Sequence, residues 1–474
     1  MNKVFSIVLV VFFSATCFGR PVKGLVCSGD QKLEGVVVTD GFNFTKTDNA
    51  GNFLLEVSDE AEFVSIVTPS GYTAKRVDGI SQFYKIYDKN TTTLKFELMP
   101  LQNNGEFVLF AVGDPQPKTD AQFNLFETKV MQDFKNTINE YAKNNIPVIT
   151  LYLGDVVWDS MPLFNKHKLA MKQIDAPFYA VIGNHDHQKD QVGDKSCRAT
   201  FSKCFGPTYY GFNLGNNYFI VLDNIIYDTN KKYVVDVDQQ QLNWLKGYVP
   251  FIPKDANVYV AMHGPVKKAW ANDFKIADGH KQILDMMSGY KLSFLTGHTH
   301  VNSNLDVNPG VIEHNVASAC GAFWLNDHAP DGTPTGYQVF ELKDKNTEWY
   351  FKTVGKDRNS QMELYAKGSF TDKPDAIVAK IWNWDPQWKV EWIEDGKNMG
   401  EMNRFEAADP AFQHAVDQMV REGVLSQAAA VKSDYMMPRT SFFYFSAIPG
   451  VNAKNIAVVA TDRFGNKYTE TIKL

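Results

Sequence analysis

Residues 177–186 read Pro-Phe-Tyr-Ala-Val-Ile-Gly-Asn-His-Asp. This stretch predicts a buried strand that is followed at once by an amide, an imidazole and a carboxylate. Four other strand-like runs, at residues 107–112, 147–153, 257–262 and 292–296, are also followed by polar side chains. The motifs that follow them are, in this order, Gly113-Asp114-Pro115-Gln116, Gly154-Asp155, His263-Gly264 and Gly297-His298-Thr299-His300. Because loops that leave the carboxyl ends of strands form the ligand crevice of an open α/β sheet, we expect these motifs to converge on one edge.

The converging side chains are of the kind that binds two metal ions. Phosphate esters repel anionic nucleophiles, and two divalent cations about 3.5–4 Å apart neutralise that charge and generate hydroxide from water near neutral pH. Such a pair needs a bridging carboxylate, while imidazole and amide groups fill the outer positions of a mixed N/O site. The pattern therefore predicts a two-metal hydrolase.

In order, spacing and glycine punctuation, the five motifs resemble those of the calcineurin-like metallophosphoesterases, whose pattern is D-x-H, GD, GNH[DE], H and GHxH. The resemblance covers roughly residues 107–300 and implies a four-layer αββα sandwich. It also implies a metal role for six side chains, namely Asp114 and His300 at the first ion, Asp155 bridging both ions, and Asn184, His263 and His298 at the second ion. His185 would then be the catalytic group that stabilises the phosphoryl transition state or protonates the leaving oxygen.

One position departs from the family pattern, because Gln116 stands where an imidazole is usual. An amide oxygen coordinates hard cations, but it is weaker and less soft than an imidazole nitrogen. With Gln116 among its ligands, the first site is expected to favour manganese, magnesium or iron over zinc, or to exchange its metal easily.

Each motif also has a purely structural interpretation when it is taken alone. A Gly-Asp or Gly-His pair is usually a turn, Asp114 before Pro115 favours a turn, and Asn184 fits an Asx-turn. Gln116 could equally be a solvated loop amide. We prefer the metal interpretation because it accounts for all five motifs together, in family order.

Composition and charge narrow the class of protein. The chain has 474 residues, of which 44% are hydrophobic and 22% charged, with a net charge of -6 and a pI near 6.0. These values are ordinary for a soluble globular protein of about two to four domains. They argue against a nucleic-acid partner, because proteins that bind the phosphate backbone carry a basic face.

The beginning of the chain predicts export. Lys3 precedes an apolar run at residues 4–15 that is too short to span a bilayer, so residues 1–19 are interpreted as a signal peptide. The alternative is a lipoprotein anchor at Cys17. No later stretch predicts a transmembrane helix, and we expect a periplasmic or secreted protein.

Four cysteines besides Cys17 occur, at positions 27, 197, 204 and 320. Cys197 and Cys204 are close enough in sequence to close a small disulfide loop in an oxidising compartment, and free or buried thiols are the equal alternative. No CxxC spacing occurs, so the cysteines do not resemble metal ligands.

Three modules are expected after the signal peptide. Residues 22–101 carry short apolar runs separated by Asp-Gly and Asn-Ala-Gly turns, which indicates hairpins, and they resemble a transthyretin-like or carboxypeptidase-regulatory-like β-sandwich. Residues 106–355 alternate strands with helical patterns at 120–144, 238–249 and 280–287, so this catalytic module is α/β.

Residues 360–474 form a third, β-rich module, within which we predict a helix at 404–422. Its Trp-rich stretch at residues 381–388 either packs in the core or stacks on a sugar or a partner.

Candidate substrate contacts are Tyr209, Tyr210 and Trp324, which lie in segments that resemble stretches near the site in exported relatives. These aromatic side chains either line the pocket or fill the core. Loop position makes His187 a candidate for supporting the metal ligands. The remaining histidines considered, His280, His314 and His328, are expected to be surface or structural residues.

Taken together, the sequence predicts an exported phosphoesterase that uses two divalent metal ions (Mn, Fe, Mg or Zn) and metal-activated hydroxide to hydrolyse a phosphate mono- or diester of small-molecule or envelope origin. Two alternatives stay open. One is a non-catalytic protein that binds an envelope glycan or a partner through a degenerate phosphoesterase domain, which Gln116 favours. The other is a hydrolase of pyrophosphate bonds, because the choice of substrate depends on loops around 187–215 and 264–279.

Overall fold

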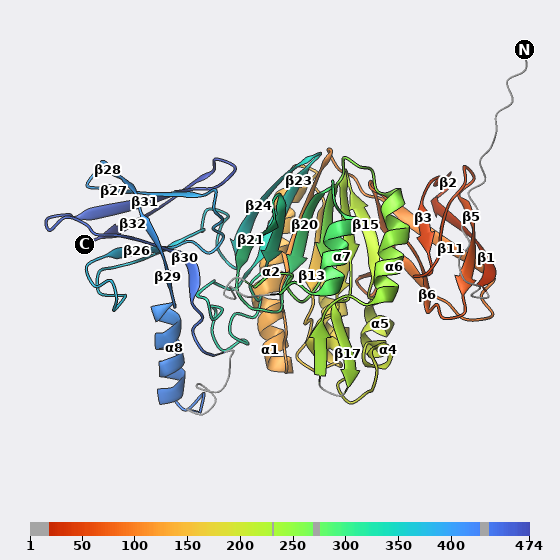
Figure 1. Ribbon diagram of the computed structural model, residues 1–474, viewed down its shortest axis with the longest axis horizontal. Helices are drawn as coiled ribbons and strands as arrows, with labels where there is room; N and C mark the ends of the chain where they lie inside the picture. The colour runs from red at the N-terminus through yellow and green to blue at the C-terminus, as the bar shows by residue number, and fades with distance from the viewer. Residues whose placement is uncertain (1–18, 230–231, 269–274, 427–435) are drawn as a thin grey trace, which may run out of the picture.

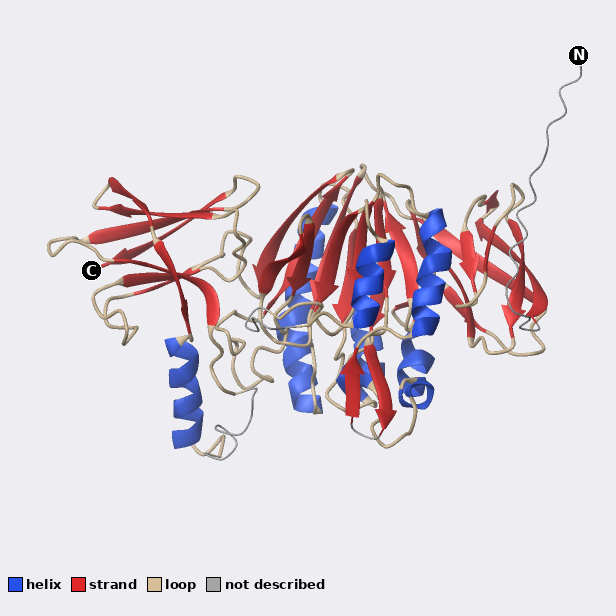
Figure 2. Cartoon of the chain, in the orientation of Figure 1, coloured by secondary structure: helices blue, strands red, loops and turns tan. Residues whose placement is uncertain are grey.

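The computed structural model describes residues 19–229, 232–268, 275–426 and 436–474, which form three parts along one axis (Figure 1). A large α/β part lies in the middle, a small β part from the beginning of the chain lies on one side, and a β-rich part with one long helix lies on the other (Figure 2). Apart from Gly19, the predicted signal peptide lies outside the described residues, as does Cys17. Over the described ranges, no helix is long and apolar enough to cross a membrane.

Two mixed sheets face each other in the central part. The first has the strand order β14-β13-β12-β23-β24, formed by Phe178–Val181, Val148–Leu153, Glu106–Val112, Gly336–Lys343 and Asn346–Thr353. The second has the order β15-β16-β19-β20-β22-β21, formed by Tyr210–Leu214, Asn217–Val221, Asn257–Ala261, Lys291–Thr296, Val311–Asn315 and Ser303–Asn308. In each sheet the strands that precede the metal motifs are parallel neighbours, so their carboxyl ends share one edge.

Helices cover the outer face of each sheet. On the first sheet lie α1 (Asp120–Leu125), the π-helical turn Phe126–Val130, α2 (Met131–Ala142), α3 (Leu163–Met171) and α5 (Ala199–Phe205). On the second lie α6 (Gln239–Tyr248) and α7 (Asp278–Met286). Side chains such as Leu109, Leu151 and Phe219 fill the space between the sheets. The predicted αββα sandwich is therefore confirmed.

The helical stripe predicted over residues 120–144 is the clearest link from sequence to packing. Phe126, Val130 and Phe134 are fully buried against the first sheet, as a helical apolar periodicity requires. Thr119 begins the helix by accepting a hydrogen bond from the backbone N–H of Gln122 at 3.3 Å. The π-helical turn shifts the register in the middle, so the stripe continues on the same face across the irregularity.

The first β part contains a two-stranded ribbon, β8 (Arg76–Val77) and β9 (Ile80–Ser81), and two larger sheets. One pairs β2 (Gln31–Lys32), β1 (Gly19–Ser28), β11 (Thr93–Pro100), β7 (Tyr72–Ala74) and β5 (Asn52–Ser58), and the other pairs β10 (Tyr84–Ile86), β6 (Phe63–Ile66), β3 (Val37–Thr39) and β4 (Phe44–Lys46). The expected Asp40-Gly41 turn joins β3 to β4. The carboxylate of Asp40 accepts hydrogen bonds from the backbone N–H groups of Phe42 and Asn43, which explains why an aspartate begins this turn.

The last part also contains two sheets. They are β25-β26-β30-β29 (Glu363–Tyr365, Ile377–Lys380, Ser441–Ala447, Asn403–Ala407) and β28-β27-β31-β32 (Lys397–Glu401, Lys389–Glu394, Asn455–Thr461, Lys467–Lys473). The buried Trp382 and Trp388 and the half-buried Trp384 pack against the core clusters of this part. Packing therefore accounts for the three tryptophans at residues 381–388.

The predicted helix at residues 404–422 is wrong at its beginning. Residues 403–407 are strand β29, which pairs with β30, and helix α8 spans Pro410–Arg421. Asp409 decides the boundary, because its carboxylate accepts hydrogen bonds from the N–H groups of Ala411 and Phe412 and Pro410 occupies the first helical position.

The disulfide predicted as one alternative between Cys197 and Cys204 is absent, and Cys27, Cys197, Cys204 and Cys320 are free thiols. The two thiols of the expected pair lie in different surroundings. Cys197 packs with Ile225 and Tyr227 and points its thiol at the carbonyl oxygen of Gln191, whereas Cys204 packs beside the helices of the first sheet.

Both outer parts make hydrogen bonds to the central part. Asn302 and Asn304, which follow the Gly-His-Thr-His motif, donate side-chain hydrogen bonds to the backbone oxygens of Trp382 at 2.8 Å and of Asn383 at 3.1 Å. On the other side, Tyr209 donates to the carbonyl oxygen of Gly41 at 3.2 Å. The last part therefore supports the loop that carries His298 and His300.

Candidate metal centre

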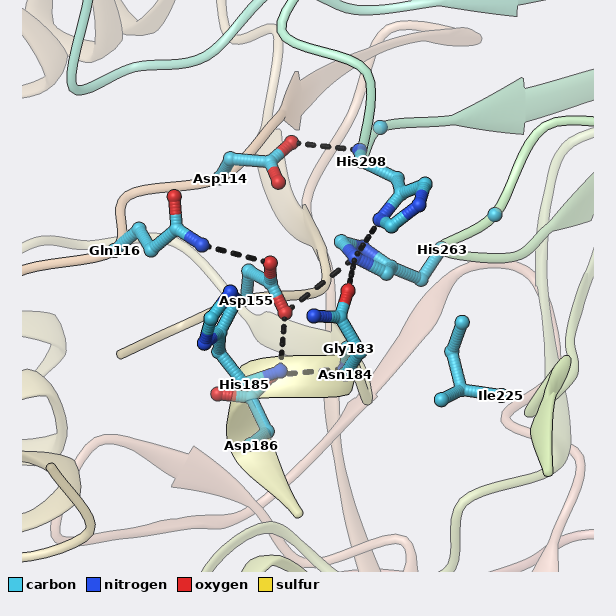
Figure 3. Close-up of polar contacts among 12 residues, drawn as sticks. Asp114, Gln116, Asp155, Gly183, Asn184, His185, Asp186, Ile225, His263 and His298 are labelled. Atoms are coloured by element: carbon cyan, nitrogen blue, oxygen red, sulfur yellow. Dashed lines mark hydrogen bonds and ion pairs between the residues drawn. The ribbon is translucent and has the colours of Figure 1, made fainter. Parts of the chain in front are cut away.

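Figure 3 shows that side chains from distant motifs meet in one place. Asp114 and Gln116 follow β12, Asp155 follows β13, Asn184 and His185 begin a short 3-10 turn after β14, His263 follows β19, and His298 and His300 follow β20. The convergence that the sequence predicted is thus present, and both sheets contribute to it.

Asp155 lies at the middle of this group. Its Oδ2 accepts a hydrogen bond from Nε2 of Gln116 at 2.8 Å. Its Oδ1 lies 3.4 Å from Nε2 of His263 and accepts the backbone N–H of His185 at 2.8 Å. The two oxygens of one buried carboxylate therefore face two different sets of side chains (Figure 3).

His263 is the centre of the second set, which also contains Asn184 and His298. Its Nε2 lies 3.0 Å from Oδ1 of Asn184 and 3.2 Å from Nδ1 of His298. Its Nδ1 lies 2.8 Å from the carbonyl oxygen of Leu153, a contact that fixes the ring and directs Nε2 into the group. Backbone contacts of this kind orient metal-binding imidazoles.

The first set consists of Asp114, Gln116 and His300, and several of its polar atoms have no hydrogen-bond partner among the described residues. Oδ1 of Asp114 lies 3.3 Å from Nε2 of His300, and Oδ2 of Asp114 accepts the backbone N–H of His298 at 2.9 Å. Oδ1 of Asp114, Oε1 of Gln116 and Nδ1 of His300 are buried without a hydrogen-bond partner among the described residues. Buried polar atoms are normally paired, so an unpaired atom on each of these three residues is compatible with a bound cation as the missing partner.

The electrostatics of the centre favour a positive charge beside Asp155. Burial acts against ionisation of Asp155, but the charges of His263 and His185 prevail and hold the pKa of this carboxyl well below its usual range. Burial lowers the pKa of His263, yet the charge of Asp155 outweighs burial and raises that pKa to about 9. Burial together with the charge of His263 lowers the pKa of His298 to about 3. The position where the second set meets Asp155 therefore favours a cationic charge.

The backbone of the candidate ligands is strained. Positive φ angles occur at Asp114, Gln116, Asp155, His298 and His300, with values of 44°, 47°, 49°, 69° and 56°. Left-handed conformations cost non-glycine residues about 1–3 kcal/mol each and gather at functional sites. The packing of both sheets therefore maintains a conformation that brings ligand side chains together.

Close approach explains the glycine punctuation of the motifs. A Cβ atom at Gly183 would collide with the backbone and the carboxylate of Asp155, and one at Gly154, whose φ is +93°, would collide with the ring of His263. These glycines allow three motif loops to touch.

Three charged side chains near the centre were not predicted from the sequence. Asp159 lies 2.9 Å from Nδ1 of His185, and Nζ of Lys189 lies 2.6 Å from the same carboxylate oxygen. Asp186 accepts the backbone N–H groups of Gly183 at 2.9 Å, and of Val156 and Val157 at 3.1 Å each, so it ties the Gly-Asn-His-Asp loop to the Gly-Asp loop. Asp159 lies four residues after Asp155 in the sequence, but this spacing alone did not indicate that its side chain contacts His185.

Aromatic side chains border the centre. The ring of Trp158 lies 4.9 Å from that of His185 and 4.4 Å from that of Phe323, and the Phe323 ring lies 4.9 Å from that of His300. On the other side, the ring of Tyr233 lies 6.2 Å from that of His298. None of these three aromatic residues was predicted as a site residue, because the sequence did not distinguish them from core aromatics.

The predicted substrate contacts are placed differently from one another. Trp324 lies beside the first motif, where its Nε1 donates to the carbonyl oxygen of Pro115 at 3.0 Å. Tyr210 is buried with its hydroxyl 3.0 Å from the backbone of Ala180, and Tyr209 contacts the first β part through Gly41. The geometry brings only Trp324 of these three next to the candidate ligands.

The additional histidines are structural in position. His280 and His314 are buried, and His328 is half-buried. His187 is also buried and lies behind the centre, where its Nδ1 contacts the carbonyl oxygen of Gly183 at 2.8 Å.

Comparisons with known proteins agree with this architecture. Residues 20–101 match the family profile described as the N terminal of calcineurin-like phosphoesterase, residues 107–302 match calcineurin-like phosphoesterase, and residues 313–468 match the C terminal of calcineurin-like phosphoesterase. No curated protein matches the sequence of the chain.

Solved structures with a similar fold include a dimetal phosphatase from Danio rerio, at 12% identity and a TM-score of 0.34, over 51% of this chain and 98% of that one. GAP50, the anchor in the inner membrane complex of Plasmodium, matches at 13% identity and a TM-score of 0.36, over 52% of this chain and 84% of that one. A 5'-nucleotidase from Candida albicans matches at 11% identity and a TM-score of 0.32, over 53% of this chain and 52% of that one.

The three family profiles follow one another along the chain in the order of its three structural parts. Together with the αββα sandwich and the ordered motifs at one edge of both sheets, they establish that the chain belongs to the calcineurin-like phosphoesterases.

Proposed function

We propose that this protein is an exported, two-metal-dependent phosphoesterase that hydrolyses a phosphate mono- or diester of small-molecule or envelope origin. The observation that carries the proposal is the position of Asp155 between two sets of potential ligands. One of its oxygens contacts Gln116 and the other lies beside His263. A carboxylate that bridges two cations needs this arrangement.

The donor atoms fit two divalent cations. Asp114, Gln116 and His300 would hold the first ion with Asp155, and Asn184, His263 and His298 would hold the second with the same carboxylate. When bound, the two ions would supply charge neutralisation and activate water near neutral pH. Because an amide stands in the first set, we propose manganese, magnesium or iron there in preference to zinc.

His185 would act on the leaving group. Its Nδ1 lies against the carboxylate of Asp159, which itself contacts the ammonium group of Lys189. A carboxylate in this position orients the imidazole, and a ring so held can give a proton to a leaving oxygen. Asp159 therefore serves as a positioning residue for His185.

The aromatic side chains at the border of the centre favour a substrate that carries an apolar or aromatic group next to its phosphate. Trp158, Phe323 and Tyr233 lie against histidines of the centre. Flat aromatic faces bury apolar groups and stack on rings. Export is proposed from the signal-like pattern of residues 1–19, and amino-terminal sequencing of the mature protein would test it.

The test of the function is hydrolysis of nitrophenyl phosphomonoesters and phosphodiesters by protein that has been freed of metal and then given Mn²⁺, Fe²⁺, Mg²⁺ or Zn²⁺. We expect turnover that a chelator abolishes. The His185→Ala variant should keep its metal but lose most turnover, and the Asp155→Ala variant should lose both.

The same panel discriminates the alternatives. Inactivity towards every ester with every metal would favour the non-catalytic binding protein, in which Gln116 occupies a degenerate first site. Activity confined to nucleoside diphosphates or other pyrophosphates would favour a pyrophosphate hydrolase.

A further inference from the structure

A second group of potential metal ligands lies behind the candidate centre. It consists of His187, Asp194 and Asp223, here called the His187 cluster. Each residue offers one nitrogen or oxygen atom, and these atoms all lie within 4.8 Å of one another. None of the three belongs to the sets that surround Asp155.

The His187 cluster joins three separate segments. His187 follows the Gly-Asn-His-Asp motif, Asp194 is the first residue of α4 (Asp194–Cys197), and Asp223 follows β16. Helix α4 lies beside β17 (Ile225–Thr229) at one end of the central part (Figure 1), and the backbone N–H of Tyr227 in β17 donates to Oδ1 of Asp194 at 3.2 Å. The cluster therefore lies where the loop after the third motif meets the second sheet.

The hydrogen bonding of His187 determines the chemistry of its ring. Nδ1 lies 2.8 Å from the carbonyl oxygen of Gly183, which can only accept, so Nδ1 carries the hydrogen. In a neutral imidazole, Nε2 then presents a lone pair. That atom is buried, has no hydrogen-bond partner in the described part of the chain, and lies 4.0 Å from Oδ1 of Asp194.

A lone pair that faces carboxylates is an unfavourable arrangement unless a proton or a metal cation lies between them. Asp223 is buried, and its Oδ1 accepts the backbone N–H of Ile225 at 3.1 Å. Arg198 provides a cationic side chain at the edge of the cluster, because its Nε lies 3.6 Å from Oδ2 of Asp194 and its Nη2 lies 3.7 Å from Glu62. Nε2 of His187, in contrast, is left without a hydrogen-bond partner among the described residues.

We propose that His187, Asp194 and Asp223 bind one divalent cation that is separate from the two-metal centre. One imidazole and two carboxylates form a mixed N/O donor set that suits zinc or manganese, with further coordination positions for water. The contact between Nδ1 of His187 and the Gly183 carbonyl is the outer interaction that commonly orients a metal-binding histidine.

The cation would have a structural effect on the candidate centre. His187 holds the carbonyl of Gly183, and the hydroxyl of Tyr227 donates to the carbonyl oxygen of Asn184 at 2.9 Å. A cation that ties His187 to α4 and to the end of β16 would therefore fix the backbone from which Asn184 and His185 project. It would act as a clamp on this loop and take no part in bond cleavage.

The test counts metal ions in the full chain. Protein freed of metal is titrated with Co²⁺, bound metal is measured by equilibrium dialysis, and the visible absorption of the bound ion is recorded. We expect three equivalents in the wild type, two in the His187→Gln variant and one in the Asp155→Asn variant. The double variant with both substitutions should bind none.

Two further variants guard against misfolding. Asp223→Asn removes a second ligand of the cluster and should also reduce binding from three equivalents to two. His314→Gln removes a buried histidine outside the cluster and should keep all three. Circular dichroism of each variant checks that the fold is retained.

The outcomes separate this proposal from the proposed function. If His187→Gln and Asp223→Asn bind as much metal as the wild type, the His187 cluster holds no cation, and His187 is instead an internal hydrogen-bonding residue. If Asp155→Asn keeps the wild-type amount, the two-metal centre is wrong while the His187 cluster is judged by its own variants.

Discussion

Nδ1 of His185 lies 2.9 Å from Oδ1 of Asp159, so a carboxylate engages one ring nitrogen of the candidate leaving-group residue. The same carboxylate oxygen lies 2.6 Å from Nζ of Lys189. Nζ of Lys189 also lies 3.1 Å from Nδ1 of His185, so Asp159 and Lys189 both face this nitrogen and leave Nε2 as the nitrogen available for proton transfer. These contacts support the proposed catalytic role of His185.

The Asp159→Asn variant should therefore lose turnover without losing metal. An asparagine keeps the shape of the side chain but removes the carboxylate that orients the His185 ring and pairs with Lys189, so kcat should fall while KM and metal content stay unchanged. The His185→Ala variant should fall further, by about 10²–10⁴-fold. Steady-state kinetics with metal analysis measure both effects. Asp190→Asn, on the exposed part of the same loop, is the matched control, and wild-type kcat in Asp159→Asn would exclude the pair from the mechanism.

The Gln116→His variant should hold zinc more tightly at the first site. The amide of Gln116 donates to Asp155 and its Oε1 is buried without a partner in the described ranges, whereas an imidazole would offer a softer nitrogen donor. The expected result is slower loss of zinc to a chelator and a shift of metal preference away from manganese. Gln132→His, on the exposed face of α2, controls for adventitious binding by a new histidine. Identical zinc loss in Gln116→His and wild type would show that residue 116 does not contact the ion.

The Asp186→Asn variant should destabilise the fold even without metal. Asp186 accepts three backbone N–H groups from two motif loops, and an amide would replace one acceptor oxygen by a donor that faces a donor. A buried group left in this state costs about 1–3 kcal/mol. Urea unfolding in the presence of a chelator measures the loss separately from metal binding. An unchanged free energy of unfolding would mean that the two loops keep their positions without this carboxylate.

The His314→Gln variant should weaken the acid sensitivity of the fold. Burial lowers the pKa of His314 from 6.5 to about 3, and the charge of Arg463 acts in the same direction. Since the unfolded chain binds a proton here below pH 6.5 and the folded chain does not, the stabilising contribution is complete above pH 6.5 and is lost as the pH falls towards 3. One such group changes the free energy of unfolding by about 1.4 kcal/mol per pH unit within this window.

Urea unfolding of metal-free protein between pH 7 and pH 4 measures this difference in slope between wild type and variant. His414→Gln, on the exposed face of α8, controls for removal of a histidine from the surface. Equal slopes for His314→Gln and wild type would show that His314 takes up its proton within the fold.

The candidate centre was predictable because its potential ligands occur in short sequence motifs. Asp155, His263 and His298 lie far apart in sequence, yet each follows a strand whose carboxyl end must reach the same edge. Likewise, apolar periodicity located the helix over residues 120–142, since the buried stripe follows from helical geometry alone.

The neighbours of the motifs were not predictable in this way. Asp159 and Phe323 reach the centre through loop conformations, and Phe323 itself has a φ of 53°. Tyr233 reaches it from strand β18 (Lys232–Val235), which pairs with β17. Tyr210 and Trp324 both lie in segments with neighbouring aromatic residues. The hydroxyl of Tyr210 is hydrogen-bonded within the core, whereas the ring of Trp324 lies beside Pro115. The boundary error at Arg404 has the same origin, because pairing of β29 with β30 overrides a helical pattern.

The sequence by itself determined an α/β central module and the residue types at the centre, because strand periodicity and motif order depend on local chemistry. The resemblance of its motifs to a known family implied the αββα arrangement. Only the tertiary structure decided which oxygen of Asp155 faces which ligands, that Asp159 holds His185, and that His187 meets Asp194 and Asp223. These relationships depend on long-range packing of loops, which the burial of both sheets enforces against local backbone preference.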